Sequence, residues 1–251
     1  MQPYMLRRGV RAVGVLRAHE NLKFSEMLIA FLSKDRRKKL FDSYREVGIR
    51  EAQKYFTILP DSEQYSFLET FVFNMYKFCD YSGKIVIDVG AQTGDSVLYF
   101  SYRGAKMIYV FEPLKNNFRI LVRNVEQNKI NCNYYNVALG DITKNVNVAV
   151  SGNMASALVT DDLAHENIKI DKLDNFNIHA DIIKIDVEGF EIEVLKGGLN
   201  TIKNAKTIII ETHSKNLQVE VAKILLGSGF HLSKIIKNYS QKNVRLEYWI
   251  K

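Results

Sequence analysis

The stretch from Lys84 to Phe100, KIVIDVGAQTGDSVLYF, decides the fold of this chain. Four apolar or β-branched residues enclose Asp88, and Gly90 and Gly94 then bracket a short turn. This pattern predicts a buried strand, a glycine turn and a helix that begins near Asp95-Ser96. Glycine lets the backbone approach a ligand closely, and the free N–H groups at a helix N-terminus attract anions. We therefore interpret this stretch as a cofactor cradle.

Downstream of this stretch, short apolar segments alternate with segments of helical periodicity. Strands are expected at 84–89, 107–111, 133–136, 182–185, 207–211, 230–236 and 244–250, and helices at 96–103, 114–127, 190–196 and 217–226. Such alternation predicts an α/β fold in which helices cover both faces of a mainly parallel, seven-stranded sheet. The segment Val146–Val150 alternates polar and apolar residues, and we expect it to pair with Ala157–Thr160 as an inserted hairpin.

Residues 1–80 show helical periodicity without recognisable chemistry. Apolar residues recur at three- and four-residue steps within 24–32 and again within 67–78, and Pro60-Asp61-Ser62 interrupts the pattern where it could cap the second helix. We expect residues 1–80 to be a helical N-terminal extension, either a lid or a packing appendage, on a domain formed by residues 81–251.

The composition is that of a globular protein with one substantial core. Of the 251 residues, 47% are hydrophobic and 25% are charged, and the net charge of +7 is a mild excess for this length. The densest basic run, Lys34–Lys39, is interpreted as a solvated helix face rather than a phosphate-binding patch. Cys79 and Cys132 lack the spacing of a disulfide framework or a zinc site, and we expect reduced structural thiols. With neither an export signal nor an apolar run long enough to span a bilayer, a cytoplasmic location is expected.

Polar residues fall at the carboxyl ends of the expected strands, where open α/β sheets bind their ligands. These residues are Asp88, Glu112, Asp141, Asp186, Glu188, Glu211 and His213. Glu112 follows the glycine turn at a distance that lets its carboxylate accept hydrogen bonds from the ribose hydroxyls of a nucleoside cofactor. Its alternative role is to cap the next helix, which Pro113 can begin. A nicotinamide cofactor fits less well, because the glycines are spaced G-x-x-x-G without G-x-G-x-x-G.

Five segments together resemble a known family. IDVGAQTGDS, VFEPLKNNFRILVRNVEQN, NVALGD, IIKIDVEGFEIEVLKGG and IIIETH occur in the order and spacing of FkbM-type methyltransferases, and the similarity covers about Gly83 to His213. The resemblance implies a Rossmann-like fold of the class I methyltransferase type and S-adenosylmethionine as the cofactor. Residues 1–80 lie outside it.

The resemblance also implies places for the parts of the cofactor. Gly90 and the turn through Gly94 would pass the methionine part, with Thr93 or Ser96 as hydroxyl donors, and Glu112 would hold the ribose.

Adenine would lie between Pro113-Leu114 and Ala138-Leu139, with Asp141 accepting a hydrogen bond from its exocyclic amine. Asp88 has two open roles, which are to order the turn or to contact the ligand.

Three residues are candidates for the chemistry of methyl transfer, which is an in-line displacement that also removes a proton from a hydroxyl acceptor. Asp186 either contacts the cofactor's ammonium or takes that proton. Glu188 takes it or caps the following helix. His213, with an ordinary pKa near ~6.5, is a third candidate base or a structural residue. We expect no metal, because no cluster has transition-metal spacing, although Mg²⁺ held by Asp186, Glu188 and Glu211 is an alternative.

The favoured function is therefore O-methylation of a hydroxyl on a small molecule, a glycan or a lipid-linked acceptor. An RNA methyltransferase is the enzymatic alternative, motivated by the basic charge but without a recognisable RNA-binding module. A non-catalytic cofactor-binding protein is the alternative from another class.

Overall fold

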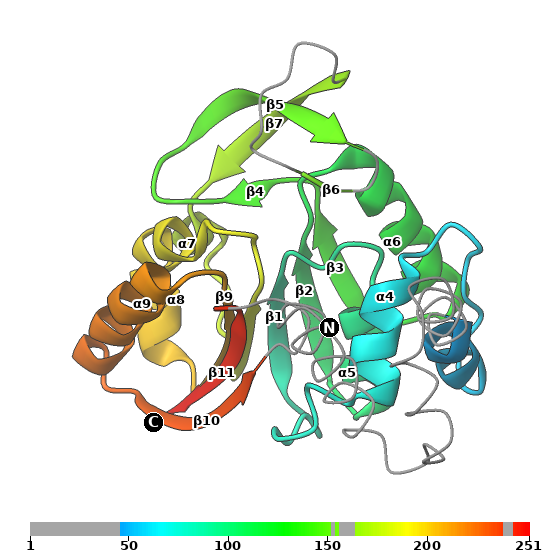
Figure 1. Ribbon diagram of the computed structural model, residues 1–251, viewed down its shortest axis with the longest axis horizontal. Helices are drawn as coiled ribbons and strands as arrows, with labels where there is room; N and C mark the ends of the chain where they lie inside the picture. The colour runs from blue at the N-terminus through cyan, green and yellow to red at the C-terminus, as the bar shows by residue number, and fades with distance from the viewer. Residues whose placement is uncertain (1–45, 152–153, 156–163, 238–242) are drawn as a thin grey trace, which may run out of the picture.

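The computed structural model describes residues 46–151, 154–155, 164–237 and 243–251 (Figure 1). Residues 46–53 are helical, and the elements that follow are α4 (Gln64–Phe67), the π-helix η1 (Leu68–Val72), β1 (Ile85–Val89), α5 (Asp95–Tyr102), β2 (Met107–Phe111), α6 (Lys115–Gln127), β3 (Cys132–Tyr135), β4 (Ala138–Leu139), β5 (Lys144–Ser151), β6 (Met154–Ala155), β7 (Ala164–Asp171), the 3₁₀-helix η2 (Leu173–Phe176), β8 (Ile182–Ile185), α7 (Glu191–Gly197), α8 (Leu199–Asn204), β9 (Thr207–Thr212), α9 (Lys215–Gly227), β10 (His231–Lys237) and β11 (Arg245–Ile250).

The main sheet has seven strands in the order β10-β11-β9-β8-β1-β2-β3. Neighbours from β3 to β9 are parallel, whereas β11 is antiparallel to both β9 and β10. The predicted mainly parallel, seven-stranded sheet is confirmed. The chain order reverses between β1 and β8, so the carboxyl ends of these two strands form the switch point where such sheets bind ligands.

Helices cover both faces of this sheet, as the alternating pattern predicted. Figure 1 shows α7, α8 and α9 on one side and α4, α5 and α6 on the other. On the first side, the sheet packs on fully buried side chains that include Val194, Ile202 and Val221. On the second side it packs on Val97 and Leu121, among others. The central strands are buried on both faces, which explains their continuous apolar runs.

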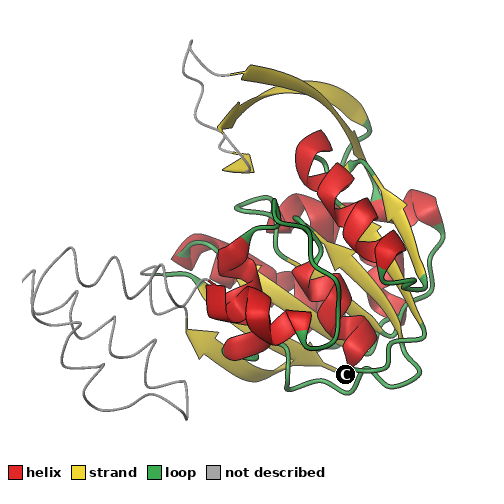
Figure 2. Ribbon diagram, turned by 90° about the vertical axis from the view of Figure 1, so that its right-hand side faces the viewer, coloured by secondary structure: helices red, strands yellow, loops and turns green. Residues whose placement is uncertain are grey.

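A second sheet, in the order β4-β7-β5-β6, is inserted between β3 and β8. Its two long strands, β5 and β7, arch away from the main body (Figure 2). The expected hairpin partner of Val146–Val150, Ala157–Thr160, lies outside the described residues. The structure pairs Val146–Val150 with Ala164–Ile168 in an antiparallel register.

The described part of the N-terminal segment packs on α5 and α6. Phe67 and Leu98 belong to one buried cluster. Asn124 of α6 donates hydrogen bonds to Ser62 Oγ and to the backbone oxygen of Thr93 in the β1 turn. Ser62 is thus held by α6, and Glu63 rather than Ser62 caps α4. The predicted helix over 67–78 is wrong beyond η1, because the chain turns at Asn74, which has a left-handed φ of 56°. The expected helix at 24–32 and the basic run lie outside the described residues.

The structure also shows the lengths of the helices and the state of the two cysteines. In the described ranges, no helix is long and apolar enough to cross a membrane. Cys79 and Cys132 are both free thiols. Burial raises the pKa of Cys79 to about 11 and that of Cys132 to about 12, so neither is a reactive thiolate at neutral pH.

Candidate active site

The turn after β1 contains three residues with left-handed backbone, which are Gly90 (φ 79°), Gln92 (φ 46°) and Gly94 (φ 95°). Gly90 also touches the end of β8, since a Cβ atom built on it would lie 1.8 Å from the backbone oxygen of Asp186. No side chain fits there. The glycine in the sequence therefore brings the β1 turn and the β8 end into direct contact.

A buried lysine ties the same two strand ends together. Lys184 is only 2% exposed, and its Nζ donates to the backbone oxygen of Gly90 at 2.8 Å and lies 3.1 Å from Asp88 Oδ1 and 3.9 Å from Asp186 Oδ2. Burial lowers the pKa of Lys184, but the charges of the surrounding aspartates outweigh this and raise it, so the ammonium stays charged. Asp88 also accepts from the Ser96 hydroxyl at 2.5 Å. Its observed contacts order the turn.

Glu112 ends β2 with its carboxylate already oriented. One oxygen accepts from the backbone N–H of Gln92 at 2.9 Å, and the other from the N–H of Leu114 at 2.9 Å. Glu112 is 3% exposed. Burial raises its pKa to about 7, although the two N–H donors act in the opposite direction. A buried carboxylate with lone pairs facing outward is suited to a pair of hydroxyl donors.

A cavity runs along the carboxyl ends of β1, β2 and β8. It is lined by Val89, Gly90, Gln92, Phe111, Glu112, Pro113, Leu114, Asn117, Val137, Ala138, Leu139, Val146, Val148, Ile168, Ile170, Asp186, Val187, Glu188 and Phe190. The wall is mostly apolar and has a few polar groups, which is typical of a cofactor site. Part of the wall comes from β5 and β7, a contribution that the sequence patterns did not indicate.

Eight of the predicted site residues line this cavity, namely Gly90, Glu112, Pro113, Leu114, Ala138, Leu139, Asp186 and Glu188. Thr93 and Ser96 do not, and their hydroxyls are engaged within the protein. Thr93 Oγ1 accepts from the backbone N–H of Glu63 at 2.9 Å, and the Ser96 hydroxyl donates to Asp88. Asp88, Gly94, Asp141 and His213 are likewise not in the lining.

Gln92 lines the cavity although the sequence patterns did not single it out. Its side-chain oxygen is buried and has no hydrogen-bond partner. Such an oxygen is ready to accept a hydrogen bond from a ligand that enters the cavity. Its position between the two glycines of the turn was the available signal.

His213 lies beside the cavity among three carboxylates of the segment 186–191. Its Nδ1 is 2.7 Å from Glu191 Oε1, and its Nε2 is 3.2 Å from Glu188 Oε2 and 3.9 Å from Asp186 Oδ1. Glu191 is fully buried at the start of α7. Glu188 is held in a left-handed conformation (φ 52°) just before that helix.

These carboxylates change the chemistry expected of His213. Burial lowers its pKa, but the hydrogen bond with Glu191 and the charges of Glu188 and Asp186 outweigh it and raise the pKa to about 9. The pKa of His213 is thus above its ordinary value, which favours the imidazolium at neutral pH. It is suited to stabilise negative charge rather than to accept a proton.

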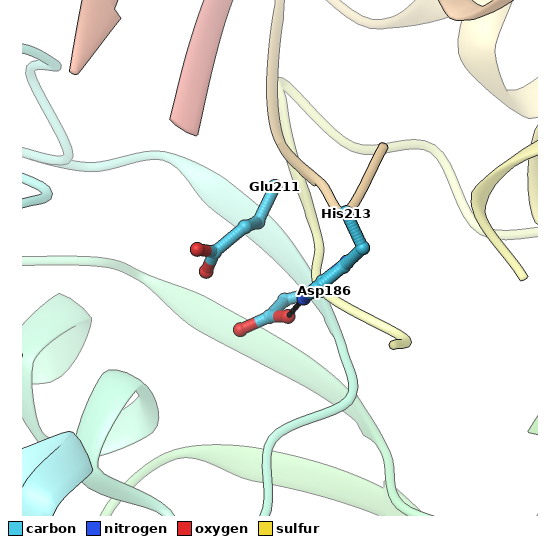
Figure 3. A group of neighbouring side chains, drawn as sticks. All are labelled: Asp186, Glu211 and His213. Atoms are coloured by element: carbon cyan, nitrogen blue, oxygen red, sulfur yellow. Dashed lines mark ion pairs between the residues drawn. The ribbon is translucent and has the colours of Figure 1, made fainter. Parts of the chain in front are cut away.

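Asp186, Glu211 and His213 form one group at the ends of β8 and β9 (Figure 3). In the part of the chain that the structure describes, each offers one ligand atom, and these atoms lie within 4.8 Å of one another. The magnesium alternative named Glu188 where the structure has His213. A protonated imidazole has no lone pair for a metal, so a cation would first have to displace the proton.

Glu69, in the π-helix η1, extends this acidic group. Burial raises its pKa well above the ordinary value, and the charges of Glu211, Asp186 and Asp95 raise it further. Short π-helical segments occur often at functional sites. No motif near Glu69 predicted this contribution from the N-terminal segment.

Comparison with known proteins gives consistent matches. The model of the FkbM methyltransferase domain matches residues 88–232. The hexuronic acid methyltransferase AglP of Haloferax volcanii is 26% identical over 154 residues, which cover 56% of this chain and 61% of that protein.

This chain is also similar to solved structures. A ribosomal protein L11 methylase from Lactobacillus delbrueckii subsp. bulgaricus is 10% identical, with a TM-score of 0.49 and coverage of 78% of this chain and 81% of that one. A SAM-dependent methyltransferase from Aquifex aeolicus is 16% identical, with a TM-score of 0.45 and coverage of 70% and 87%.

Proposed function

Because this chain belongs to the FkbM methyltransferase family, we propose that it transfers the methyl group of S-adenosylmethionine to a hydroxyl of a glycan-type acceptor. The observation that carries the proposal is a single cavity lined by both Glu112, oriented by two backbone N–H groups, and Asp186. The name of the hexuronic acid methyltransferase relative supports a glycan-type acceptor over other small molecules and lipid-linked acceptors.

The residues of the cavity fit this cofactor. Glu112 would accept both ribose hydroxyls, and the apolar wall near Leu114 and Ala138-Leu139 would hold the adenine. The unpartnered Gln92 oxygen would accept from the ammonium of the methionine part. When bound, the cofactor supplies an activated methyl group on a sulfonium.

The transfer breaks a sulfur–carbon bond and forms a carbon–oxygen bond, and the acceptor hydroxyl loses its proton late in the reaction. We propose that Asp186 receives this proton, because it lines the cavity and lies beside two cations, Lys184 and His213. Glu188 then acts mainly as a partner of His213.

We propose the division into an extension of residues 1–80 and a methyltransferase domain of residues 81–251, supported by the packing of the described N-terminal segment on α5 and α6. A cytoplasmic location is also proposed, because both cysteines are free thiols.

The decisive test combines binding with product analysis. S-adenosylhomocysteine at millimolar concentration should raise the melting temperature of the chain. Radiolabelled methyl groups should then appear in the glycan fraction of a lysate incubated with the protein and the labelled cofactor. No thermal stabilisation would rule out both methyltransferase hypotheses, stabilisation without transferred label would favour the non-catalytic cofactor-binding protein, and label in RNA would favour the RNA methyltransferase alternative.

A further inference from the structure

A second hollow lies beside the acidic group, between the N-terminal segment and the edge strand β10. Its walls include the aromatic rings of Tyr65, Phe73 and Phe78 on one side and residues 234–237 on the other. Phe78 is 44% exposed, so part of its ring is accessible to a ligand in this hollow. We refer to this hollow as the lysine groove.

Three lysines give the groove its charge. Lys77, Lys234 and Lys237 line it, and all three are exposed. Lys234 Nζ lies 3.9 Å and Lys77 Nζ 5.4 Å from the centre of the Phe78 ring. The groove therefore combines aromatic surface, on which the apolar face of a sugar ring can pack, with ammonium groups that can bind an acidic substituent.

The groove opens at the same edge of the sheet as the catalytic residues. Lys237 pairs with Arg245 across β10 and β11, and Arg245 pairs with Thr212 across β11 and β9. These residues form one row across three strands, so the backbone of Lys237 lies about 10 Å from that of Thr212, which precedes His213. A ligand of one or two sugar rings can bridge that span.

Glu69 joins the groove to the acidic group. It lines the groove and interacts electrostatically with Asp186 and Glu211. The groove is therefore positively charged where the lysines lie and acidic where it meets the catalytic residues. An acidic ligand would orient with its anion toward the lysines and its hydroxyls toward Glu69.

We propose that the lysine groove binds the acceptor as an acidic saccharide, with its acidic group among the lysines and the hydroxyl to be methylated at the Glu69 end. This inference rests on the proposed function, and it adds the charge of the acceptor and the surface that selects it. The methyl group then forms an ether with a hydroxyl rather than an ester with the acid.

The test uses the full chain saturated with S-adenosylhomocysteine on an array of carboxylated, phosphorylated and neutral oligosaccharides. Acidic members should bind at least about fivefold more tightly than neutral ones, and the preference should weaken with ionic strength. The variant K234Q/K237Q should lose this preference, whereas the matched variant K203Q/K223Q, which removes two exposed lysines elsewhere, should keep it. Comparing the carboxylated with the phosphorylated members identifies which acid is recognised.

Each contrary result has one meaning. If S-adenosylhomocysteine does not bind, the proposed function fails. If it binds but acidic members are not preferred, or K234Q/K237Q keeps the preference, the groove proposal fails and the proposed function stands. If the label transferred from radiolabelled S-adenosylmethionine in a separate incubation is released by mild alkali, as a methyl ester would be, the proposed orientation is overturned.

Discussion

Glu112 and His213 both lie at the carboxyl edge of the same sheet, yet their surroundings differ. Glu112 is held by backbone N–H groups from its own loop and the neighbouring glycine turn. His213 is held by side chains of Glu191, Glu188 and Asp186. The half of the site around β1 and β2 is thus fixed by backbone, and the half around β8 and β9 by ionic side chains. Substitutions in the first half should alter binding, and those in the second should alter chemistry.

The largest effect is expected at Gly90, where the two halves touch. Gly90→Ala forces a Cβ onto the Asp186 backbone oxygen and also imposes a left-handed φ on alanine. We expect a loss of more than about 3 kcal/mol in the free energy of unfolding. Gly83→Ala, also left-handed but with open space around it, should cost only about 1 kcal/mol. Chemical denaturation measures both, and equal losses would show that the contact between the halves is unimportant.

Asp186→Asn should come next. It keeps the shape of the side chain but removes the proposed proton acceptor, so the rate of methyl transfer should fall about 100-fold or more while the melting temperature changes little. Asp61→Asn is the matched control, because Asp61 is exposed and does not line the cavity. An unchanged rate in Asp186→Asn would remove Asp186 from the chemistry.

Glu112→Ala tests the other half. Losing a charged acceptor for two ribose hydroxyls should weaken S-adenosylhomocysteine binding about 30-fold, measured by calorimetry. The rate at saturating cofactor should stay within a few-fold of the parent protein. A large fall in that rate without a change in affinity would contradict the division between the two halves.

The smallest expected effect is the pH dependence of cofactor binding. Glu112 has a pKa of about 7 in the free protein, and hydroxyl donors stabilise its ionised form. Affinity should therefore fall about five- to tenfold as the pH is lowered from 8 to 6, because Glu112 is then protonated. His213, with a pKa of about 9, stays charged over this range and contributes nothing. The dependence should vanish in Glu112→Ala, and a dependence that persists there would assign it to another group.

The main sheet, and the half of the site around β1 and β2, could be predicted from the amino-acid sequence alone. Apolar runs and helical periodicity predicted the seven strands, and Gly90, Glu112 and Asp186 were each found at a strand end. These signals are local, because the preferences for strands, turns and helix caps depend on residues that are close together in the sequence. The Thr93 hydroxyl accepts a hydrogen bond from the backbone of Glu63 in the N-terminal segment, which no local pattern predicts, whereas the Ser96 hydroxyl donates to Asp88 within the same stretch.

The ionic half of the site could be identified only from the tertiary structure. Lys184 and Glu191 lie in one of the five quoted segments, but no pattern there predicts that they contact Asp88 and His213, and Glu69 comes from the N-terminal segment. The hydrogen bond with Glu191 and the charges of Glu188 and Asp186 raise the pKa of His213 and favour its cationic form. The electrostatic energy of a charged group depends on its burial and on its distance from other charges, and neither can be read from the order of residues in the sequence.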